Sequence, residues 1–581
     1  MTAWERSRAR GSGRRLLACS IVLLLCGCGV LPSSMLAQVP TSGPIEQGEQ
    51  ISGGNADQFI RVIARGPRDG MSPMQVVQGF LDASASFDAD HAVARQYLTA
   101  RANQSWDTAA GVTVYEGVGA LTGFDRDVSF TATLAGRISE TGHYSVEDSG
   151  LQESLRFGLV RQEGQWRIDR LPQGLLLSLF DVDRAFRSLA VYFFDPSFQT
   201  LVPDARMIPV IGSAQATTLV RDLVDGPSQW LQPAVRTGFP PGVELAIESV
   251  PIEGGIAKVV LSANAALMGD SSRRAISQQL TWTLGQVLGV SAVEVMAGSL
   301  PLEVPGVGSV QPVGAWRQVD PASMPTDAAA IFERDGVVLR AGALVDEPLP
   351  GEAGVGNVQL TELAQDRQGQ RIAGLDSQGT LWTAEIAEGS VLQPILAERG
   401  LRSPSFDRSG AIWVVDDELG LASVQQDGRL QRIQLTGLGP QAELIEAVGS
   451  RDGTRAALIV QDGPRRGLLL ARVVRASLSG LPQVNEPIRV ESRLTDVLDV
   501  AWSGPNSLAV IGSDGAGSPQ AFEVDIARAS VASLGGPVEP ASIAAAPGKP
   551  TLVAASDGLV YALIADSWRP LGPGRSPAYP G

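Results

Sequence analysis

The chain has 581 residues, of which 44% are apolar and 19% charged, and its formal net charge is −16. This composition excludes a disordered chain, and the length predicts two to four globular domains. The acidic balance disfavours binding to nucleic acid, because contacts to phosphate need clustered cations.

The first 28 residues have the pattern of an export signal. Five arginines and one glutamate precede an uncharged run, Leu16–Cys26, which ends in the segment Leu25-Cys26-Gly27-Cys28. Such a run is too short and wrongly flanked to remain as a membrane-spanning helix, so residues 1–27 are predicted to be a cleaved signal peptide. An uncleaved anchor helix is the alternative, and it would give the same membrane location.

The segment LCGC resembles a bacterial lipobox, in which the cysteine is acylated and becomes the new N-terminus. The resemblance implies that Cys28 carries an S-diacylglycerol and an N-acyl group, and two acyl chains suffice for stable anchoring. Leu16-Leu17-Ala18-Cys19 fits the same local pattern, but no apolar segment precedes it. The third cysteine is Cys26, so a chain that begins at Cys28 can form no internal disulfide.

Residues 28–69 are predicted to be a tether, because they are rich in glycine, proline, serine, glutamine and glutamate. An ordered strand over Phe59–Ile63 is the alternative within this segment.

Residues 70–185 show helices followed by strands. Ser72 is a predicted N-cap with Pro73 at the first helical position, and Gln75 closes a capping box. A second helix is expected to begin near Asp88 or Asp90. Alternating residues predict half-buried strands over 128–134 and 155–159. Helices packed on one curved antiparallel sheet resemble the α+β NTF2-like cone, which is the predicted fold of this unit.

Residues 188–305 form the second predicted unit. The expected strands are Leu189–Phe194, Met207–Val210, Val243–Val250, Ile256–Leu261 and Ala292–Ala297. Helices are expected over Gln215–Val224 and after a cap at Asp270, where apolar residues recur at helical spacing. The series FDPS, LVDGPS, FPPGVEL, VVLS, QLTWTLGQV and AVEVMAG resembles the α/β GerMN domain. GerMN domains occur in exported bacterial proteins and are not known as catalysts.

Residues 315–581 contain degenerate repeats of a polar turn followed by a short apolar strand. The turn glycines are separated by 41, 43, 51 and 44 residues, and they are Gly369, Gly410, Gly453, Gly504 and Gly548. This period suits a four-stranded blade and predicts an all-β propeller of about six blades. A further strand within Ile331–Arg340 suggests that both ends of this unit complete one blade.

No constellation of residues indicates catalysis or a metal site. The two histidines, His91 and His143, have no second histidine or cysteine nearby in sequence and are given packing or surface roles. Asp407 and the run Asp416-Asp417-Glu418 could serve as a general acid and base, but all four are predicted to be turn residues, and the run is predicted to be solvated. Scattered tryptophans are assigned to domain cores rather than to a sugar platform: Trp230, Trp282, Trp316, Trp382, Trp413 and Trp502. No cofactor is expected, no catalytic residue is assigned, and ligand-binding residues stay unassigned.

The order of lipobox, tether, NTF2-like unit, GerMN unit and propeller resembles the LpqB lipoproteins of actinobacteria. That resemblance implies a lipid-anchored protein on the outer face of the cell membrane. It further implies an accessory regulator that acts on the extracytoplasmic domain of a two-component sensor kinase, in an MtrA–MtrB-like system, and affects the envelope and cell division. One alternative is a lipoprotein that senses or carries a lipid or cell-wall fragment in the mouth of the cone. Another is a wall-active hydrolase, which would require Asp407, Asp416 or Glu418 to converge in one cleft.

Overall fold

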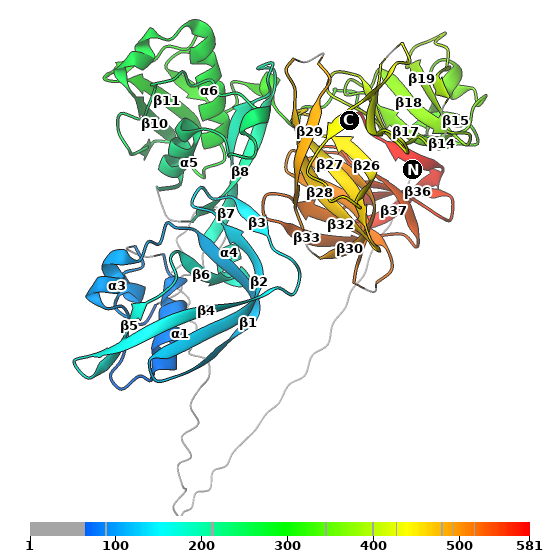
Figure 1. Cartoon of the computed structure of the whole chain (residues 1–581). Coiled ribbons are helices and arrows are strands. Elements are labelled where there is room, and N and C mark those ends of the chain that lie inside the picture. The colour runs from blue at the N-terminus through cyan, green and yellow to red at the C-terminus, as the bar shows by residue number, and fades with distance from the viewer. Residues whose placement is uncertain are drawn as a thin grey trace, which may run out of the picture. The chain divides into compact units, whose positions relative to one another are not determined.

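The computed structural model describes residues 64–581, apart from 88–89, 211–213, 343–344, 398–399, 426, 478–479, 492 and 516 (Figure 1). Cys28, the signal segment 1–27 and the tether up to residue 63 lie outside the described residues. Within the part that is described, no helix is long and apolar enough to cross a membrane.

The first unit pairs helices with a six-stranded sheet of order β5-β4-β2-β1-β6, with β3 beside β2. Its strands are β1 (Val112–Phe124), β2 (Asp127–Ile138), β3 (Tyr144–Val146), β4 (Gln152–Gln162), β5 (Gln165–Arg170) and β6 (Leu175–Ser178). Its helices are α1 (Pro73–Ser84), α2 (Ala92–Arg95), α3 (Ala100–Ser105) and α4 (Leu179–Ala185). The apolar face of α1 packs against β1, β2, β5 and β6.

The start of α1 confirms the predicted capping box. Ser72 Oγ accepts a hydrogen bond from the backbone N–H of Gln75 at 3.3 Å, and Gln75 Oε1 accepts one from the Ser72 N–H at 2.8 Å. The second predicted helix is only the four-residue α2. It ends early because the backbone on either side of Leu98 pairs with Ile168 of β5, so tertiary pairing replaces a further helical turn.

The second unit contains a hairpin and a mixed sheet. The hairpin strands are β7 (Phe186–Phe194) and β8 (Leu201–Pro209). The sheet consists of β9 (Ile252–Glu253), β10 (Ile256–Leu261), β11 (Ala292–Ala297), β12 (Leu300–Pro301) and β13 (Val310–Pro312), with β10 and β11 parallel. Two helices belong to this unit, α5 (Ala214–Asp225) and α6 (Asp270–Leu284).

Two expectations for this unit are wrong in detail. The predicted strand Val243–Val250 is irregular and makes one isolated bridge, between Leu245 and Leu261. Val243 and Val250 are nevertheless buried in the core of this unit, so their apolar character reflects packing and not a strand ladder. Asp270 is the first residue of α6 rather than its cap, which is Gly269.

The third unit is a propeller of six four-stranded blades. Each blade is given from its inner strand outward: the first contains β17 (Leu360–Gln365), β18 (Arg371–Asp376), β19 (Thr380–Glu385) and β20 (Gln393–Ala397), and the second contains β21 (Arg402–Phe406), β22 (Ile412–Asp416), β23 (Gly420–Val424) and β24 (Leu430–Arg432). The third contains β26 (Glu443–Gly449), β27 (Arg455–Asp462), β28 (Arg465–Val474) and β29 (Gln483–Arg489), with β25 (Gln434–Leu435) beside β29. The fourth contains β30 (Leu494–Gly504), β31 (Ser507–Asp514), β32 (Gln520–Asp525) and β33 (Ser530–Gly535), and the fifth contains β34 (Pro540–Ala544), β35 (Leu552–Ala555), β36 (Leu559–Ile564) and β37 (Ser567–Pro573).

The last blade joins the two ends of this unit, as the repeats predicted. Its inner strand is β38 (Arg575–Ala578), and its other strands are β14 (Ile331–Arg334), β15 (Val337–Arg340) and β16 (Glu347–Pro348). Antiparallel pairing of β38 with β14 closes the ring (Figure 1). Blades repeated around one axis leave only short, protected strand edges and enclose a central channel.

Candidate functional site in the propeller channel

Every inner strand of the propeller is interrupted by a β-bulge. The pairing register shifts in β17, β21, β26, β30, β34 and β38. A bulge bends its strand and re-aims the side chains next to it. In β17 and β26 the residue that follows the register shift is an acid, Glu362 and Glu446 respectively. The register of β30 shifts three times, and Asp499 follows the second shift.

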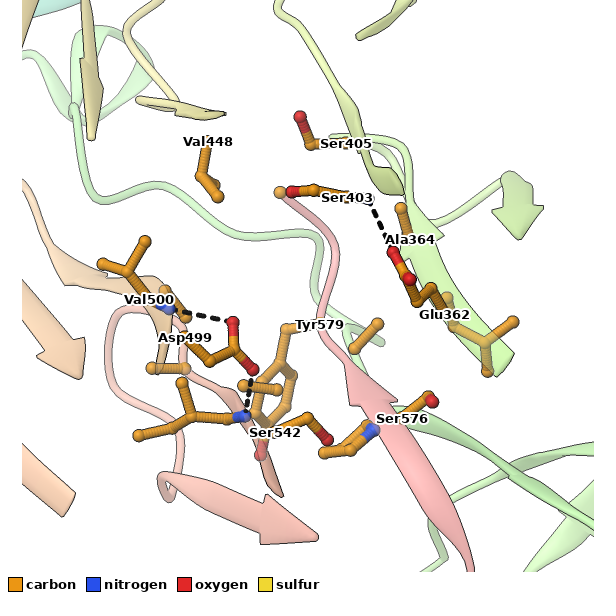
Figure 2. Close-up of a pocket in the computed structure, with 18 of the residues that line it drawn as sticks. Glu362, Ala364, Ser403, Ser405, Val448, Asp499, Val500, Ser542, Ser576 and Tyr579 are labelled. Carbon is orange, nitrogen blue, oxygen red and sulfur yellow. Dashed lines mark hydrogen bonds between the residues drawn. The ribbon is translucent and has the colours of Figure 1, made fainter. Parts of the chain in front are cut away.

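The inner strands surround a cavity of about 560 Å³. Figure 2 shows that its lining comes from separate blades, with Glu362 from β17, Asp499 from β30 and Ser542 from β34 around one space. Its polar lining residues are Thr361, Glu362, Gln365, Arg402, Ser403, Ser405, Glu446, Arg451, Asp499, Ser542, Arg575, Ser576 and Tyr579. Apolar groups such as Ala364 and Val448 fill the surface between them.

Backbone N–H groups fix two of the three carboxylates. Ser403 donates its N–H to Glu362 Oε2 at 2.6 Å. Asp499 accepts at both oxygens, from the N–H of Val500 at 2.8 Å and from the N–H of Ile543 at 2.7 Å (Figure 2). Asp499 therefore links β30 to the next inner strand, β34.

The third carboxylate, Glu446, lies beside Asp499. The side chains of Glu446 and Asp499 are hydrogen-bonded to each other, so one of them must carry a proton. Burial raises the pKa of Asp499 to about 7. Burial, together with the charge of Asp499, raises the pKa of Glu446 well above its ordinary value. Burial also raises the pKa of Glu362, against the opposing effects of the Ser403 N–H and Arg402.

These carboxylates are half-buried by accessible surface, and the surface they expose faces the cavity. Among the described residues, no arginine or lysine forms an ion pair with Glu362, Glu446 or Asp499. The arginines beside them are paired with other acids. Arg402 contacts Asp417 and lies 2.9 Å from Glu443, and Arg575 is paired with Glu333. This part of the cavity therefore gains negative charge, without a paired cation, as Asp499 loses its proton near pH 7.

A buried cation lines the same cavity farther along the strands. Arg451 is 8% exposed and donates to the carbonyl oxygens of Pro580 at 2.5 Å, Ser323 at 3.0 Å and Arg367 at 3.3 Å. Its Nε has no hydrogen-bond partner, and within the described ranges no carboxylate pairs with it. Burial, with the neighbouring charges of Arg367 and Arg408, lowers its pKa to about 10.

The two histidines lie away from this cavity, in the first unit. His91 is 6% exposed, its ring centroid lies 4.9 Å from that of Phe87, and burial lowers its pKa. Burial also lowers the pKa of His143, to about 4. Across the described residues, no group of three or more histidine, cysteine or acidic side chains has the geometry to hold a metal ion.

The acids weighed for hydrolysis are structural turn residues. Asp407 accepts the N–H groups of Ser409 and Ala411 before β22, and Asp416 accepts those of Glu418 and Leu419 after it. Asp407 and Asp416 thus sit at opposite ends of one strand, and neither they nor Glu418 line the cavity. Asp416 is 5% exposed, so the expectation of a solvated turn is wrong for this residue.

The cone offered a second location for a ligand, but aromatic side chains pack between α1 and the sheet there. The ring of Phe80 lies 5.1 Å from that of Trp106 and 6.1 Å from that of Phe157, and all three side chains are buried. The cavity described above lies instead in the propeller.

Sequence reasoning missed the three cavity carboxylates, although a signal was present. Glu362 and Glu446 each stand seven residues before a turn glycine, and Asp499 stands five residues before one. An acid at a repeated position of the inner strand is unexpected on packing grounds, since that strand is the most enclosed of a blade. Alignment of the repeats on their turn glycines would have placed Glu362 and Glu446 in one column, but not Asp499.

Comparison with known proteins decides the family. Residues 66–183 match the N-terminal domain of lipoprotein LpqB, residues 190–303 match the Germane domain of sporulation and spore germination proteins, and residues 336–580 match the LpqB β-propeller domain. Lipoprotein LpqB of Thermobifida fusca is 31% identical over 97% of both chains. The chain belongs to the LpqB family.

Other LpqB lipoproteins match over a similar extent. The one from Streptomyces coelicolor is 29% identical over 99% of both chains, and the one from Cutibacterium acnes is 29% identical over 90% of both. Among solved structures, the match to TolB from Acinetobacter baumannii extends over 43% of this LpqB family chain and 66% of the TolB chain, with 16% identity and a TM-score of 0.34.

Proposed function

We propose that this LpqB family member is anchored to the outer face of the cell membrane by acyl groups on Cys28. We further propose that it acts there as an accessory regulator of a two-component sensor kinase, in an MtrA–MtrB-like system that controls the envelope and cell division. The observation that supports the anchoring is the match over 97% of both chains to a protein named a lipoprotein, and the family models cover all three domains.

The domain content supports a role in binding other molecules rather than in turnover. Propellers present a broad face of loops and a central channel. A lipid anchor confines the protein and a membrane-bound kinase to one plane, so that weak contacts occur at a high effective concentration. Regulation then requires that the protein bind one conformation of the kinase better than another.

The anchor is tested by replacing Cys28 with serine, which removes the thiolate that the lipid modifies. We expect the full-length Cys28→Ser protein to lose the mass of the acyl groups and to leave the membrane fraction, because an unlipidated chain lacks the two acyl chains that hold it. Fractionation with mass spectrometry measures both effects. Cys19→Ser is the matched control and keeps the lipid. Full retention of acyl groups by Cys28→Ser would contradict the assignment.

The regulatory role is tested by direct binding. We expect full-length protein in lipid nanodiscs to bind the extracytoplasmic domain of the cognate sensor kinase saturably, and to change autophosphorylation of the kinase when both occupy one nanodisc. Cys28→Ser protein added from solution serves as the control for co-localisation, and it should act only at higher concentration. Absence of both binding and any change in autophosphorylation would refute the kinase role.

A second function is favoured by the propeller cavity, which contains convergent polar groups and acids with raised pKa values. Both features are typical of ligand sites. We propose, as the alternative to kinase regulation, a lipoprotein that senses or carries a cell-wall fragment or a lipid. Native mass spectrometry of protein extracted mildly from cells should show a bound small molecule that Glu446→Gln protein lacks.

A further inference from the structure

The two uncompensated charges of the propeller cavity are opposite in sign and separate in position. The carboxylates Glu362, Glu446 and Asp499 follow the bulges of their strands. Arg451 lies beyond the last residue of β26, which is Gly449. Arg451 has carbonyl acceptors but no carboxylate, and the three acids have backbone donors or each other but no cation, so a ligand that carries both charges would supply the missing partner at each end.

The spacing of these charges sets the length of a ligand that reaches both. Glu446 and Gly449, the last residue of β26, are about 10 Å apart at the rise of a strand, and Arg451 follows Gly449 by two residues. Extended chain also advances about 3.3–3.6 Å per residue, so three residues span about 10 Å. A cavity of about 560 Å³ is within the range of small-molecule sites.

We propose that the propeller cavity binds a short peptide of two or three residues, with its protonated amino group at Glu362, Glu446 and Asp499 and its carboxylate at Arg451. The lining serines and backbone groups between the two ends supply hydrogen bonds along the ligand. This proposal deepens the second function above by naming the class of ligand, and it does not depend on the kinase.

Binding of the amino group should be linked to release of the proton that Glu446 and Asp499 share. Below pH 7 the pair is largely neutral and attracts a cation weakly, and above pH 7 it is negative. A peptide amino group itself loses its proton near pH 8. Affinity is therefore expected to be greatest between about pH 7 and pH 8 and to fall about tenfold by pH 5.5. The other charged or titratable groups that line the cavity are Glu362, Arg402, Arg451, Arg575 and Tyr579.

The decisive experiment is calorimetric titration of full-length protein in detergent with tri-alanine, its N-acetyl form and its C-terminal amide. We expect tri-alanine to bind, and each capped form to bind at least about tenfold more weakly, because each cap removes one charge-assisted contact. Equal binding of all three forms would overturn the proposal. Absence of tri-alanine binding at millimolar concentration would also overturn it.

Variants of the protein test the same contacts from the other side. Glu446→Gln should weaken the binding of tri-alanine but leave the already weak binding of the N-acetyl form unchanged. Arg451→Gln should also weaken the binding of tri-alanine, but it should leave the already weak binding of the amide form unchanged. Glu385→Gln is the matched control, since Glu385 is an exposed acid at the end of β19 in the same blade as Glu362. If Arg451→Gln fails to fold, the capped peptides still decide the question.

The outcomes separate this proposal from the functions proposed above. If the wild-type protein binds a molecule other than a short peptide, and Glu446→Gln protein does not bind it, the proposal of a peptide ligand is wrong but the proposal of a ligand-binding function is supported. Peptide binding without any effect on the kinase would support the peptide site and count against the regulatory role alone.

Discussion

Replacement of Asp407 by alanine is expected to destabilise the propeller by about 3–5 kcal/mol, the cost of breaking a buried ion pair on one side. Asp407 is 4% exposed and lies 2.7 Å from the guanidinium of Arg475, which is itself buried. Its other hydrogen bonds come from Trp413 Nε1 at 3.1 Å, from Ser409 Oγ at 2.5 Å and from the turn N–H groups of Ser409 and Ala411. Alanine leaves all of these donors, including a buried cation, without an acceptor.

Urea unfolding followed by tryptophan fluorescence measures this effect, since one of the ten tryptophans, Trp413, lies in the blade concerned. Asp427→Ala is the matched control: Asp427 also pairs with an arginine in this blade, but both partners are exposed. A surface change of this kind is expected to leave the free energy of unfolding almost unchanged. A loss below about 1 kcal/mol for Asp407→Ala would contradict a structural role for this carboxylate and would reopen the question of a functional one.

Replacement of Asp499 by asparagine is expected to remove a pH dependence from the stability of the propeller. The pKa of Asp499 is raised by burial from 3.8 to about 7, so between these values the folded state binds a proton that the unfolded state does not. Stability of the wild-type protein therefore falls as pH rises through this window. From pH 5 to pH 7 the variant should gain on the wild type by roughly 2 kcal/mol.

The comparison is made by urea unfolding of both proteins at each pH. Asparagine offers one acceptor oxygen where Asp499 uses two, which adds a cost that does not vary with pH. Asp376→Asn is the control, because the pKa of Asp376 is shifted in the opposite direction from that of Asp499. Burial would raise the pKa of Asp376, but hydrogen bonds from Trp382, Thr380 and Gln378 outweigh it and lower the pKa, so no change is expected across this window. A stability difference between wild type and Asp499→Asn that is constant from pH 5 to pH 7 would contradict the shared proton.

Local signals in the sequence predicted those elements whose residues interact with near neighbours. The capping box at Ser72 and Gln75 is satisfied within one helical turn. Four of the five turn glycines, Gly369, Gly410, Gly453 and Gly548, have the positive φ that a tight turn requires. The fifth, Gly504, ends β30 without positive φ, so its hairpin differs from the others.

Predictions failed where a distant segment determined the outcome. The helix expected near Asp88 or Asp90 is cut to four residues because its continuation pairs with Ile168, some seventy positions away in the chain. The apolar run at 243–250 is buried without a partner strand. Asp416 is enclosed although its neighbours are polar, because the turn amides of Glu418 and Leu419 satisfy it.

The lipobox resemblance, the order of three domains and the period of the propeller can all be read along the chain, since each depends on composition or on spacing. The site could not be found in that way. Glu362, Glu446 and Asp499 stand more than fifty positions apart from one another, and ring closure brings them to one cavity. Their unusual protonation follows from burial and from mutual contact, which are properties of the folded ring and of no single repeat.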